Sequence, residues 1–316
     1  MKECVVGFDT SNYTTSVAVC TLDGRVVANL KRPLPVREGQ RGLRQSDAVF
    51  EHTRNLEPLC ASLGELLAKE GYSPVAVGVS AAPRDAEGSY MPCFLSGVAA
   101  ARAFAAALDI PLYKFSHQSG HIMAAAYSSG EALRLMEEPF VAFHVSGGTT
   151  EALYVQPSKK GISVVTVGET EDINAGQLID RVGVMMGLSF PAGREMEGLA
   201  SEYTGKIYKH PVCVRDGKCS LSGAENIAAR LYGEGGSSSA VAAFVFDFIL
   251  RTLLAMGEDM EKRYGRTRVL FAGGVMSNRL MRQALSRRFD AYYAEPEFSA
   301  DNAAGIALLC RDAYLN

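Results

Sequence analysis

The chain has 316 residues, with 32 basic and 35 acidic side chains, so its formal net charge is −3. Hydrophobic residues make up 47% and charged residues 21% of the sequence, a balance that is typical of globular proteins and excludes a disordered or fibrous chain. The length predicts about two domains, and the near-neutral charge excludes a protein coated with basic residues, although it permits a local basic patch.

No membrane segment is expected, because the longest apolar runs, such as residues 99–110, are too short or are interrupted by charges. The N-terminal residues run directly into a predicted strand and lack the apolar core of a signal peptide. The seven cysteines form no Cys-x-x-Cys pair, which is typical of thiols in a reducing compartment. These features predict a cytoplasmic protein.

A long-range repeat organises the sequence. Residues 6–15, Val-Gly-Phe-Asp-Thr-Ser-Asn-Tyr-Thr-Thr, are similar to residues 141–150, Val-Ala-Phe-His-Val-Ser-Gly-Gly-Thr-Thr, at an offset of 135. Each copy has the pattern of a strand, a turn of small residues and a second strand, followed by a third strand. The second strands are predicted at 16–20 and 151–155, and the third at 25–30 and 162–167.

Helical patterns follow each group of strands. Helices are predicted at 45–70, 96–108, 174–186, 239–264 and 279–288, and short buried strands at 75–79 and 268–271. Strands that alternate with helices predict an α/β fold in which helices cover the faces of a sheet. We expect two lobes, 1–135 and 136–316, with a cleft between them.

Two irregular segments interrupt this pattern. Residues 203–238 are polar and rich in glycine, which predicts an insertion or a mobile loop in the second lobe. Residues 31–44 are basic and irregular. They fit either a solvated loop or a contact with a polyanion.

Two histidines four residues apart are the most specific local signal. In the run His117-Gln118-Ser119-Gly120-His121, the two imidazoles would lie one turn apart on one helix face. At this spacing they could bind one zinc or iron ion, whereas the alternative is two ordinary histidines at a helix start. Gln118 stands where a zinc peptidase needs a glutamate as general base, which excludes that class.

Such a metal site usually needs a third, anionic ligand. Asp301 precedes a predicted helix of small residues, and its alternative role is that of a helix N-cap. We expect the two imidazoles of the first lobe and this carboxylate of the second lobe to meet across the cleft.

Small-residue turns recur at equivalent places in the two halves. The turn Ser146–Thr150 joins two strands, so it is not a Walker A loop, but its backbone N–H groups and hydroxyls could hold a phosphate. The repeat puts Ser11–Thr15 in the equivalent turn of the first half. Two phosphate-facing hairpins are the arrangement of the actin, sugar kinase and Hsp70 superfamily, and plain hairpins are the alternative.

The second half offers further candidates for nucleotide contacts. Gly273 and Gly274 follow a predicted strand, and paired glycines let a flat ring or a ribose approach the backbone, unless they serve only a tight turn. Asp180 is polar in an otherwise apolar helix pattern. It could accept hydrogen bonds from ribose hydroxyls or form a salt bridge with Arg181 or another cation.

Taken in order, these motifs resemble one family, the tRNA threonylcarbamoyladenosine synthase transferases (TsaD, also called Gcp). The matching segments are 117–121, 145–149, 180–193, 271–278 and 301–304. They spread over nearly the whole chain, and their combination is specific although each alone is not.

The resemblance implies a duplicated, two-lobed α/β fold of the actin-like (ASKHA, RNase H-like) type. It implies His117, His121 and Asp301 as ligands of one divalent ion, iron or zinc, and Asp9 and Ser11 as catalytic residues. The nucleotide or substrate contacts that it implies are Val145, Ser146, Gly147, Gly148, Thr149, Asp180, Gly193, Gly273, Gly274 and Asn278.

The family transfers a threonylcarbamoyl group from an AMP adduct to adenosine beside the tRNA anticodon. The resemblance therefore implies an adenine nucleotide as cofactor and tRNA as partner. It also implies protein partners of the threonylcarbamoylation system and a dimer through the first lobe. No membrane partner is expected.

The chain departs from the family pattern close to the expected substrate. Tyr13 and Thr14 replace two carboxylates of the first turn, and Asp9 keeps one acid that could order magnesium. Thr149 replaces a histidine, and Pro-Gly-Gly-Pro becomes Pro-Ala-Gly-Arg at 191–194.

A lysine of the family is also lost within Ser220–Asn226. These departures predict a divergent paralogue. The alternative is a non-catalytic or nucleotide-hydrolysing paralogue that acts as a partner subunit or on a small-molecule acceptor.

Overall fold

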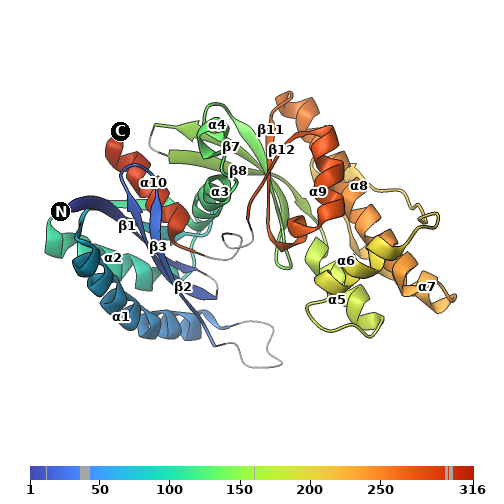
Figure 1. Ribbon diagram of the computed structural model, residues 1–316, viewed down its shortest axis with the longest axis horizontal. Coiled ribbons are helices and arrows are strands. Elements are labelled where there is room, and N and C mark those ends of the chain that lie inside the picture. Colours follow the sequence, from blue (N-terminus) through green and yellow to red (C-terminus); the bar gives the residue numbers. More distant parts are fainter. Residues whose placement is uncertain (12, 36–42, 160, 296–297, 299–301) are drawn as a thin grey trace. The chain divides into compact units, whose positions relative to one another are not determined.

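The structure is a computed structural model that describes residues 1–11, 13–35, 43–159, 161–295, 298 and 302–316. The chain forms two compact units (Figure 1). Unit 1 comprises Met1–Glu138, Gln156–Val164 and Glu297–Asn316, and unit 2 comprises Pro139–Val155 and Val165–Pro296. The first boundary lies close to the expected one, but the C-terminal residues belong to the first unit and not to the second.

Unit 1 is built on a five-stranded sheet in the order β3-β2-β1-β4-β5. Its strands are β1 (Lys2–Ser11), β2 (Thr14–Thr21), β3 (Val26–Pro33), β4 (Tyr72–Ala82) and β5 (Leu112–Ser116). β1 pairs antiparallel with β2 and parallel with β4, and β4 pairs parallel with β5. Helices cover both faces of this central strand, which explains why the eight residues from Cys4 to Ser11 are all buried.

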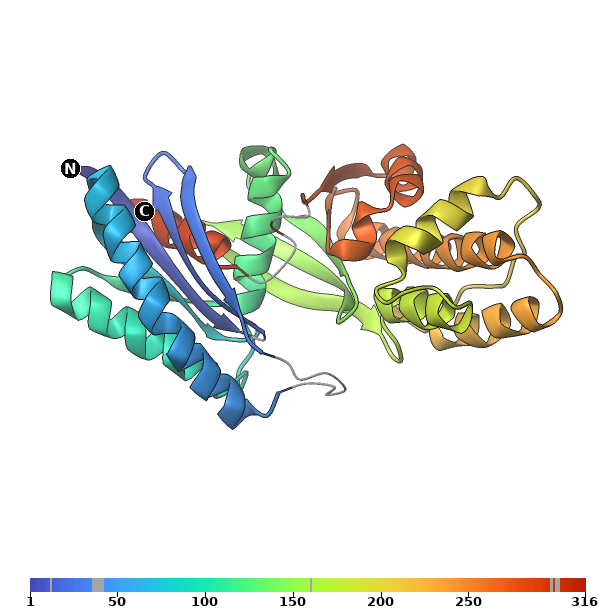
Figure 2. The ribbon, with the colours of Figure 1, turned by 60° about the horizontal axis from the view of Figure 1, so that its bottom comes forward.

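Helices of two different kinds cover the two faces of this sheet. α1 (Gln45–Glu70) and α2 (Phe94–Leu108) lie side by side over one face, with large side chains such as Leu63 and Phe8 in the core between (Figure 2). α3 (His117–Ser128) and α10 (Ala304–Leu315) pack on the other face, largely through alanines, and α4 (Ala132–Leu135) follows α3.

Glycines allow α10 to approach unit 1 closely. A Cβ added to Gly305 would lie 1.8 Å from the carbonyl oxygen of Gly120 in α3, and one added to Gly7 of β1 would lie 2.6 Å from the amide nitrogen of Ala307. This packing is the reason that the end of the chain belongs to unit 1. The expectation that the segment after Asp301 belongs to the second lobe is therefore wrong.

Unit 2 repeats the topology of unit 1. The sheet has seven strands in the order β12-β11-β6-β7-β8-β10-β9, so β8-β7-β6-β11-β12 corresponds to β3-β2-β1-β4-β5. The end of β7 and the start of β8 fall in the segment Gln156–Val164 that belongs to unit 1. The strands are β6 (Phe140–Val145), β7 (Thr150–Ser158), β8 (Gly161–Thr170), β9 (Val214–Arg215), β10 (Lys218–Cys219), β11 (Arg268–Ala272) and β12 (Asp290–Tyr293). As in unit 1, the first strand pairs antiparallel with the second and parallel with the fourth, which confirms the predicted duplication.

The long helix α8 forms the core of unit 2. The helices of the unit are α5 (Ala175–Met185), α6 (Gly193–Glu202), α7 (Ser222–Gly233), α8 (Ser238–Tyr264), the 3₁₀ turn η1 (Gly274–Ser277) and α9 (Arg279–Arg288). Contrary to our expectation, α8 is long and apolar enough to cross a membrane, but 67% of its most apolar stretch is buried inside the protein. Since large side chains such as Phe244 and Ile249 fill the interior, α8 has the character of a core helix.

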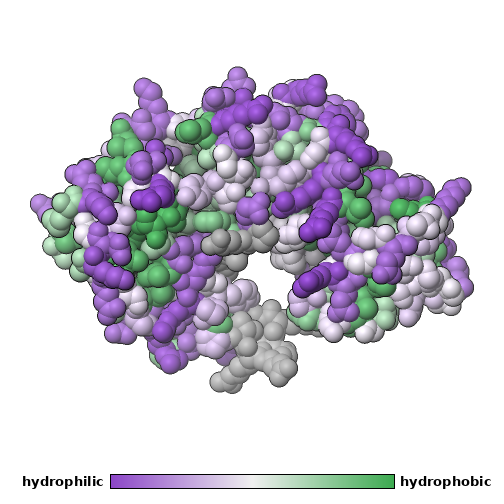
Figure 3. Space-filling model, in the orientation of Figure 1, coloured by the Kyte–Doolittle hydropathy of each residue, from purple (hydrophilic) through white to green (hydrophobic). Residues whose placement is uncertain are grey.

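Apolar side chains on the surface form small patches among hydrophilic ones on the face drawn in Figure 3. Isolated exposed apolar residues of this kind are usual in globular proteins. They include Leu95 and Leu133 of unit 1 and Phe190 of unit 2.

The segment 203–238 is more ordered than expected for a mobile loop, because it contains β9, β10 and α7. One carboxylate holds the start of α7. Asp172 lies just after β8 and accepts hydrogen bonds from the backbone of Leu221 (2.8 Å) and from the backbone and hydroxyl of Ser222 (3.0 and 2.6 Å). Burial raises the pKa of Asp172, but these bonds and one from Ile173 outweigh it and hold that pKa below its usual value.

Replacing Asp172 should therefore destabilise the protein. Asp172→Ala leaves the amide groups at the start of α7 without their acceptor, so we expect the free energy of unfolding to fall by about 1–3 kcal/mol. Denaturant titration followed by circular dichroism measures this. Glu171→Ala is the matched control, because its ion pair with Lys218 is exposed and should contribute at most about 0.5 kcal/mol.

The lowered pKa gives the Asp172 effect a pH dependence. Above a pH of about 4 the carboxylate is ionised in both the folded and the unfolded chain, and its contribution to the free energy of unfolding is complete. That contribution is lost as the pH falls through the lowered pKa of the folded state. The difference between the wild type and Asp172→Ala should therefore shrink in acid. An unchanged difference at pH 3 would contradict the role of the charge.

Candidate functional site

A buried hydrogen-bond network surrounds Asp9 in unit 1. Asp9 lies near the end of β1 and is fully buried. Its Oδ2 accepts hydrogen bonds from the Ser11 hydroxyl (2.9 Å) and faces Nδ1 of His117 at 3.0 Å, and its Oδ1 accepts the hydroxyl hydrogen of Ser80. These three partners hold the carboxylate from inside the protein, and the magnesium ion considered at Asp9 stays a prediction.

The two histidines of the sequence motif lie together at the start of α3. The helix begins because the Ser116 side chain accepts a hydrogen bond from the Ser119 amide at 3.0 Å. The His117 and His121 rings are 4.2 Å apart between centroids and meet edge to face at 74°. A carboxylate accepts hydrogen bonds, so the Asp9 contact fixes the proton on Nδ1 of His117 and makes Nε2 the ring atom suited to a metal.

The third expected ligand, Asp301, lies outside the described residues. Among the residues that are described, no group of three or more His, Cys, Asp or Glu side chains has the geometry to hold a metal ion. The structure therefore brings together two of the three predicted ligands, and the assignment of Asp301 stays a prediction.

The first hairpin turn does not present its hydroxyls as expected. Ser11 and Thr15 are fully buried. Ser11 bonds to Asp9, and the Thr15 hydroxyl faces Nδ1 of His52 at 2.9 Å. Both hydroxyls thus serve the interior of unit 1, which argues against a phosphate-binding role and against direct catalysis by Ser11. Tyr13 is 45% exposed.

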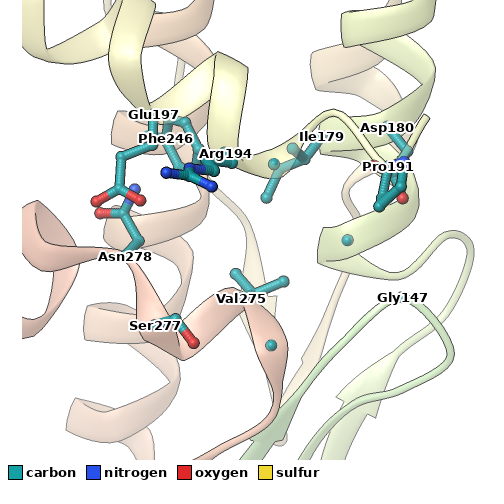
Figure 4. Close-up of a pocket in the computed structure, with 13 residues that line it drawn as sticks. Gly147, Ile179, Asp180, Pro191, Arg194, Glu197, Phe246, Val275, Ser277 and Asn278 are labelled. Carbon is teal, nitrogen blue, oxygen red and sulfur yellow. The ribbon is translucent and has the colours of Figure 1, made fainter. Parts of the chain in front are cut away.

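A pocket of about 450 Å³ lies entirely within unit 2 (Figure 4). It is lined by Gly147, Gly176, Ile179, Asp180, Pro191, Gly193, Arg194, Glu197, Phe246, Gly274, Val275, Ser277 and Asn278. Five of the ten predicted nucleotide contacts are among these residues: Gly147, Asp180, Gly193, Gly274 and Asn278. Residues that are 131 positions apart in the sequence, from Gly147 to Asn278, thus converge on one cavity.

The other five predicted contacts shape the pocket and do not line it. The Ser146 hydroxyl accepts hydrogen bonds from the amides of Gly148 (3.2 Å) and Thr149 (3.1 Å), so the turn itself occupies two of the N–H groups expected to face a phosphate. Val145 is fully buried. Gly273 has φ +97°, and a Cβ there would lie 2.3 Å from the carbonyl oxygen of Val145.

Gly176 is a functional position that the sequence analysis missed. It is the second residue of α5, and a Cβ there would lie 2.6 Å from the amide nitrogen of Gly147. The glycine therefore lets the N-terminus of α5 touch the turn that lines the pocket. The only sequence signal is a glycine just after a capping asparagine, Asn174, which is too common to be specific.

Polar groups of the pocket are only partly paired. Asp180 accepts a hydrogen bond from the Ala192 amide (2.8 Å), while Arg181 pairs with Glu225, so the alternative Asp180–Arg181 salt bridge is wrong. Asn278 caps α9 by accepting from the Met281 amide at 2.9 Å. Its amide nitrogen is buried without a hydrogen-bond partner, and a buried donor of this kind favours a ligand that supplies an acceptor.

Comparison with known proteins gives the family. The model of the family "TsaD: tRNA N6-adenosine threonylcarbamoyltransferase" matches residues 40–308. A tRNA N6-adenosine threonylcarbamoyltransferase of Methanopyrus kandleri is 30% identical over 96% of this chain and 85% of its own length. That of Streptococcus sanguinis is 32% identical over 96% of this chain and 90% of its own length.

Solved structures of low sequence identity share the fold. HypF of T. kodakarensis gives a TM-score of 0.65 at 13% identity over 99% of this chain, which spans about half (48%) of the HypF chain. Component A of the Acidaminococcus fermentans (R)-2-hydroxyglutaryl-CoA dehydratase gives 0.54 at 13% identity, covering 99% of both chains.

A ROK hexokinase of Thermus thermophilus gives a TM-score of 0.53 at 15% identity, over 99% of this chain and 98% of that one. These neighbours support the predicted actin-like α/β fold with its duplicated sheet. Together with the family match and the relatives, they lead to one conclusion: the chain belongs to the tRNA N6-adenosine threonylcarbamoyltransferase family.

Proposed function

We propose that the chain binds an adenine nucleotide in the pocket of unit 2 and transfers a threonylcarbamoyl group from an AMP adduct to adenosine beside the tRNA anticodon. The observation that carries the nucleotide part is the pocket itself. It combines glycine backbone at Gly147 and Gly274, a carboxylate at Asp180 and the unpaired buried amide nitrogen of Asn278. Glycines admit a ligand close to the backbone, and the polar groups suit ribose hydroxyls and ring nitrogens.

The proposed reaction is an acyl transfer. The exocyclic amine of adenosine attacks the carbamoyl carbonyl carbon and loses a proton. A carbon–nitrogen bond forms while the bond between that carbon and the AMP phosphate oxygen breaks, and AMP leaves with the electron pair. The task of the pocket residues is to hold the adenylate so that its carbonyl group is oriented for attack.

We further propose that His117, His121 and Asp301 hold one divalent ion, iron or zinc. The imidazole pair fits, because Asp9 orients His117 as second carboxylates orient metal-bound histidines. Asp301 precedes Gly305 by four residues, a span of at most about 14 Å, and Gly305 touches Gly120 between the two histidines. When bound, the ion would act as a Lewis acid on carbamoyl or phosphate oxygens.

Removal of the proposed ligands should empty the metal site. We expect His117→Ala, His121→Ala and Asp301→Ala each to lower the bound metal to well below one ion per chain, as measured by inductively coupled plasma mass spectrometry of the purified protein. His210→Ala, in unit 2 and outside the proposed ligand set, is the control and should retain the metal. Metal content unaffected by all three substitutions would refute the assignment.

The burial of Asp9 and Ser11 favours a positioning role for both in place of the direct catalytic role that the resemblance implies. Asp9→Asn keeps the size of the side chain but removes the charge that holds the His117 ring, so the ring should be less firmly oriented. Metal affinity should therefore fall about 10- to 100-fold. Competition with a chelating dye measures this affinity. Ser11→Ala, which leaves the Asp9–His117 contact in place, should change it by less than about 3-fold.

The acceptor and the partners follow from the family and remain part of the proposal. The relatives act on tRNA by their names, and we propose tRNA as acceptor, subunits of the threonylcarbamoylation system as protein partners, and a cytoplasmic location. The substitution of two carboxylates by Tyr13 and Thr14 favours a second candidate, a paralogue that binds nucleotide without modifying tRNA.

One assay separates the two candidates. Purified protein is incubated with threonylcarbamoyl-adenylate, with and without unmodified tRNA, while AMP release and tRNA mass are followed. The transferase predicts AMP release that depends on tRNA, a tRNA mass increase, and a fall of at least about 10-fold in Asn278→Ala, whose buried donor is lost. Nucleotide binding without any tRNA mass change, also after addition of the proposed partner subunits, would support the paralogue and exclude the transferase.

A further inference from the structure

Arg194 is an unusual residue at the edge of the unit 2 pocket. It lies in the first turn of α6, just after the first helical residue, Gly193. The N-terminus of a helix carries partial positive charge, so a cation there is electrostatically unfavourable. Within the described part of the chain, Arg194 makes no hydrogen bond or ion pair that would offset this unfavourable position of its charge. It stands where the family carries proline, so the shape of the turn does not require arginine.

The neighbours of Arg194 identify which end of a ligand it faces. Figure 4 shows Glu197 and Asn278 on the Arg194 side of the pocket, with Gly147 on the opposite side. The amides of Gly148, Thr149, Ala175 and Gly176 near this turn already have acceptors, which leaves the Gly147 amide to bind a phosphate. Figure 4 shows one carboxylate on each side, Asp180 towards Gly147 and Glu197 towards Arg194. On the Arg194 side Glu197 lies next to Asn278, whose buried amide nitrogen has no partner.

Glu197 disfavours a second phosphate beside Arg194, and with the Asn278 amide nitrogen it offers one acceptor and one donor to the edge of a base. Glu197 uses one oxygen to accept the Arg279 amide at 2.9 Å, and its other oxygen makes no hydrogen bond within the described residues. A phosphate close to this oxygen would be repelled, whereas hydroxyls and the donors of a base would bind it. The nucleoside part of a nucleotide therefore belongs on the Arg194 side.

We infer that Arg194 stacks its flat guanidinium on the base of the bound nucleotide and so contributes to base affinity. The 3₁₀ turn at Val275 would pack on the opposite face of the ring, and Figure 4 shows Arg194 and Val275 on facing walls. Guanidinium groups bind aromatic faces through cation–π and stacking contacts. This inference rests on the proposed nucleotide function of the pocket and adds to it a base-recognising residue particular to this chain.

Four substitutions test the inference through the dissociation constant of ATP, measured by isothermal titration calorimetry on the full chain. Arg194→Met removes both the charge and the planar guanidinium group and should weaken ATP binding about 3- to 30-fold. Arg194→Lys keeps the charge without the plane and should weaken it similarly. Arg194→Tyr keeps a flat ring without the charge and should stay within about 3-fold of the wild type. Arg181→Met, on the neighbouring helix but outside the pocket, is the control and should match the wild type.

The alternatives give different patterns. If Arg194 instead paired with a phosphate, Arg194→Lys would retain affinity and Arg194→Tyr would lose it, which overturns the stacking role. ATP affinity unchanged in all Arg194 variants would overturn it too, while leaving the proposed nucleotide site intact. A wild-type protein that binds no ATP would overturn both the proposed site and this inference.

Discussion

The contact between α3 and α10 is the constraint on which the candidate metal site depends. Two glycines allow it, because the carbonyl oxygen of Gly120 occupies the space where a side chain of residue 305 would begin. A larger residue at position 305 would separate the two helices, whereas one at position 120 would first meet the end of the Ile306 side chain at 2.8 Å. The result is that the beginning of the C-terminal helix lies against the turn that carries His117 and His121, although 184 residues separate His121 from Gly305 in the sequence.

Asp9 connects this region to the sheet. It lies on the central strand β1, and its hydrogen bonds reach β4 through Ser80 and α3 through His117. A buried carboxylate is costly unless its oxygens are well satisfied, and here three donors satisfy them. The network therefore fixes the orientation of an imidazole from inside the protein, which is the usual arrangement behind a histidine that binds a metal.

Unit 2 has the same sheet topology as unit 1 but forms a pocket for a ligand. Its pocket is formed where the loops after β6 and β11 and the starts of α5 and α6 meet, and glycines at 147, 176, 193 and 274 keep these segments free of side chains. The polar groups that remain are few, and each has a defined direction. Asn278 caps α9 with its oxygen, so its nitrogen is fixed and offers one donor to the pocket. In unit 1 the Ser11 and Thr15 hydroxyls of the equivalent hairpin are buried and bonded within the unit, so the two hairpins differ in what they offer to a ligand.

The sequence by itself determined the elements with strong periodicity. The helix at 45–70 and its end at Gly71 were predicted correctly, since Leu56, Leu59 and Leu63 repeat at helical spacing and glycine adopts the left-handed conformation of the cap. The repeat at 6–15 and 141–150 predicted the duplicated sheet, and the spacing of His117 and His121 predicted their proximity within one turn. Apart from the repeat, whose two copies lie 135 residues apart, these features depend on residues close together in the chain.

Only the tertiary structure decided which distant residues meet. The apolar residues of 304–310 fit many surfaces, so the sequence alone does not show that α10 packs on unit 1 and not on unit 2. Likewise, Gly176, Arg194 and Glu197 have no local pattern that marks them as pocket residues. Ser11 and Thr15 have hydroxyls suited to a phosphate, yet in the folded chain these hydroxyls are buried and contact Asp9 and His52, respectively. Periodicity records which face of an element is buried, whereas the partner of that face depends on packing across the whole chain.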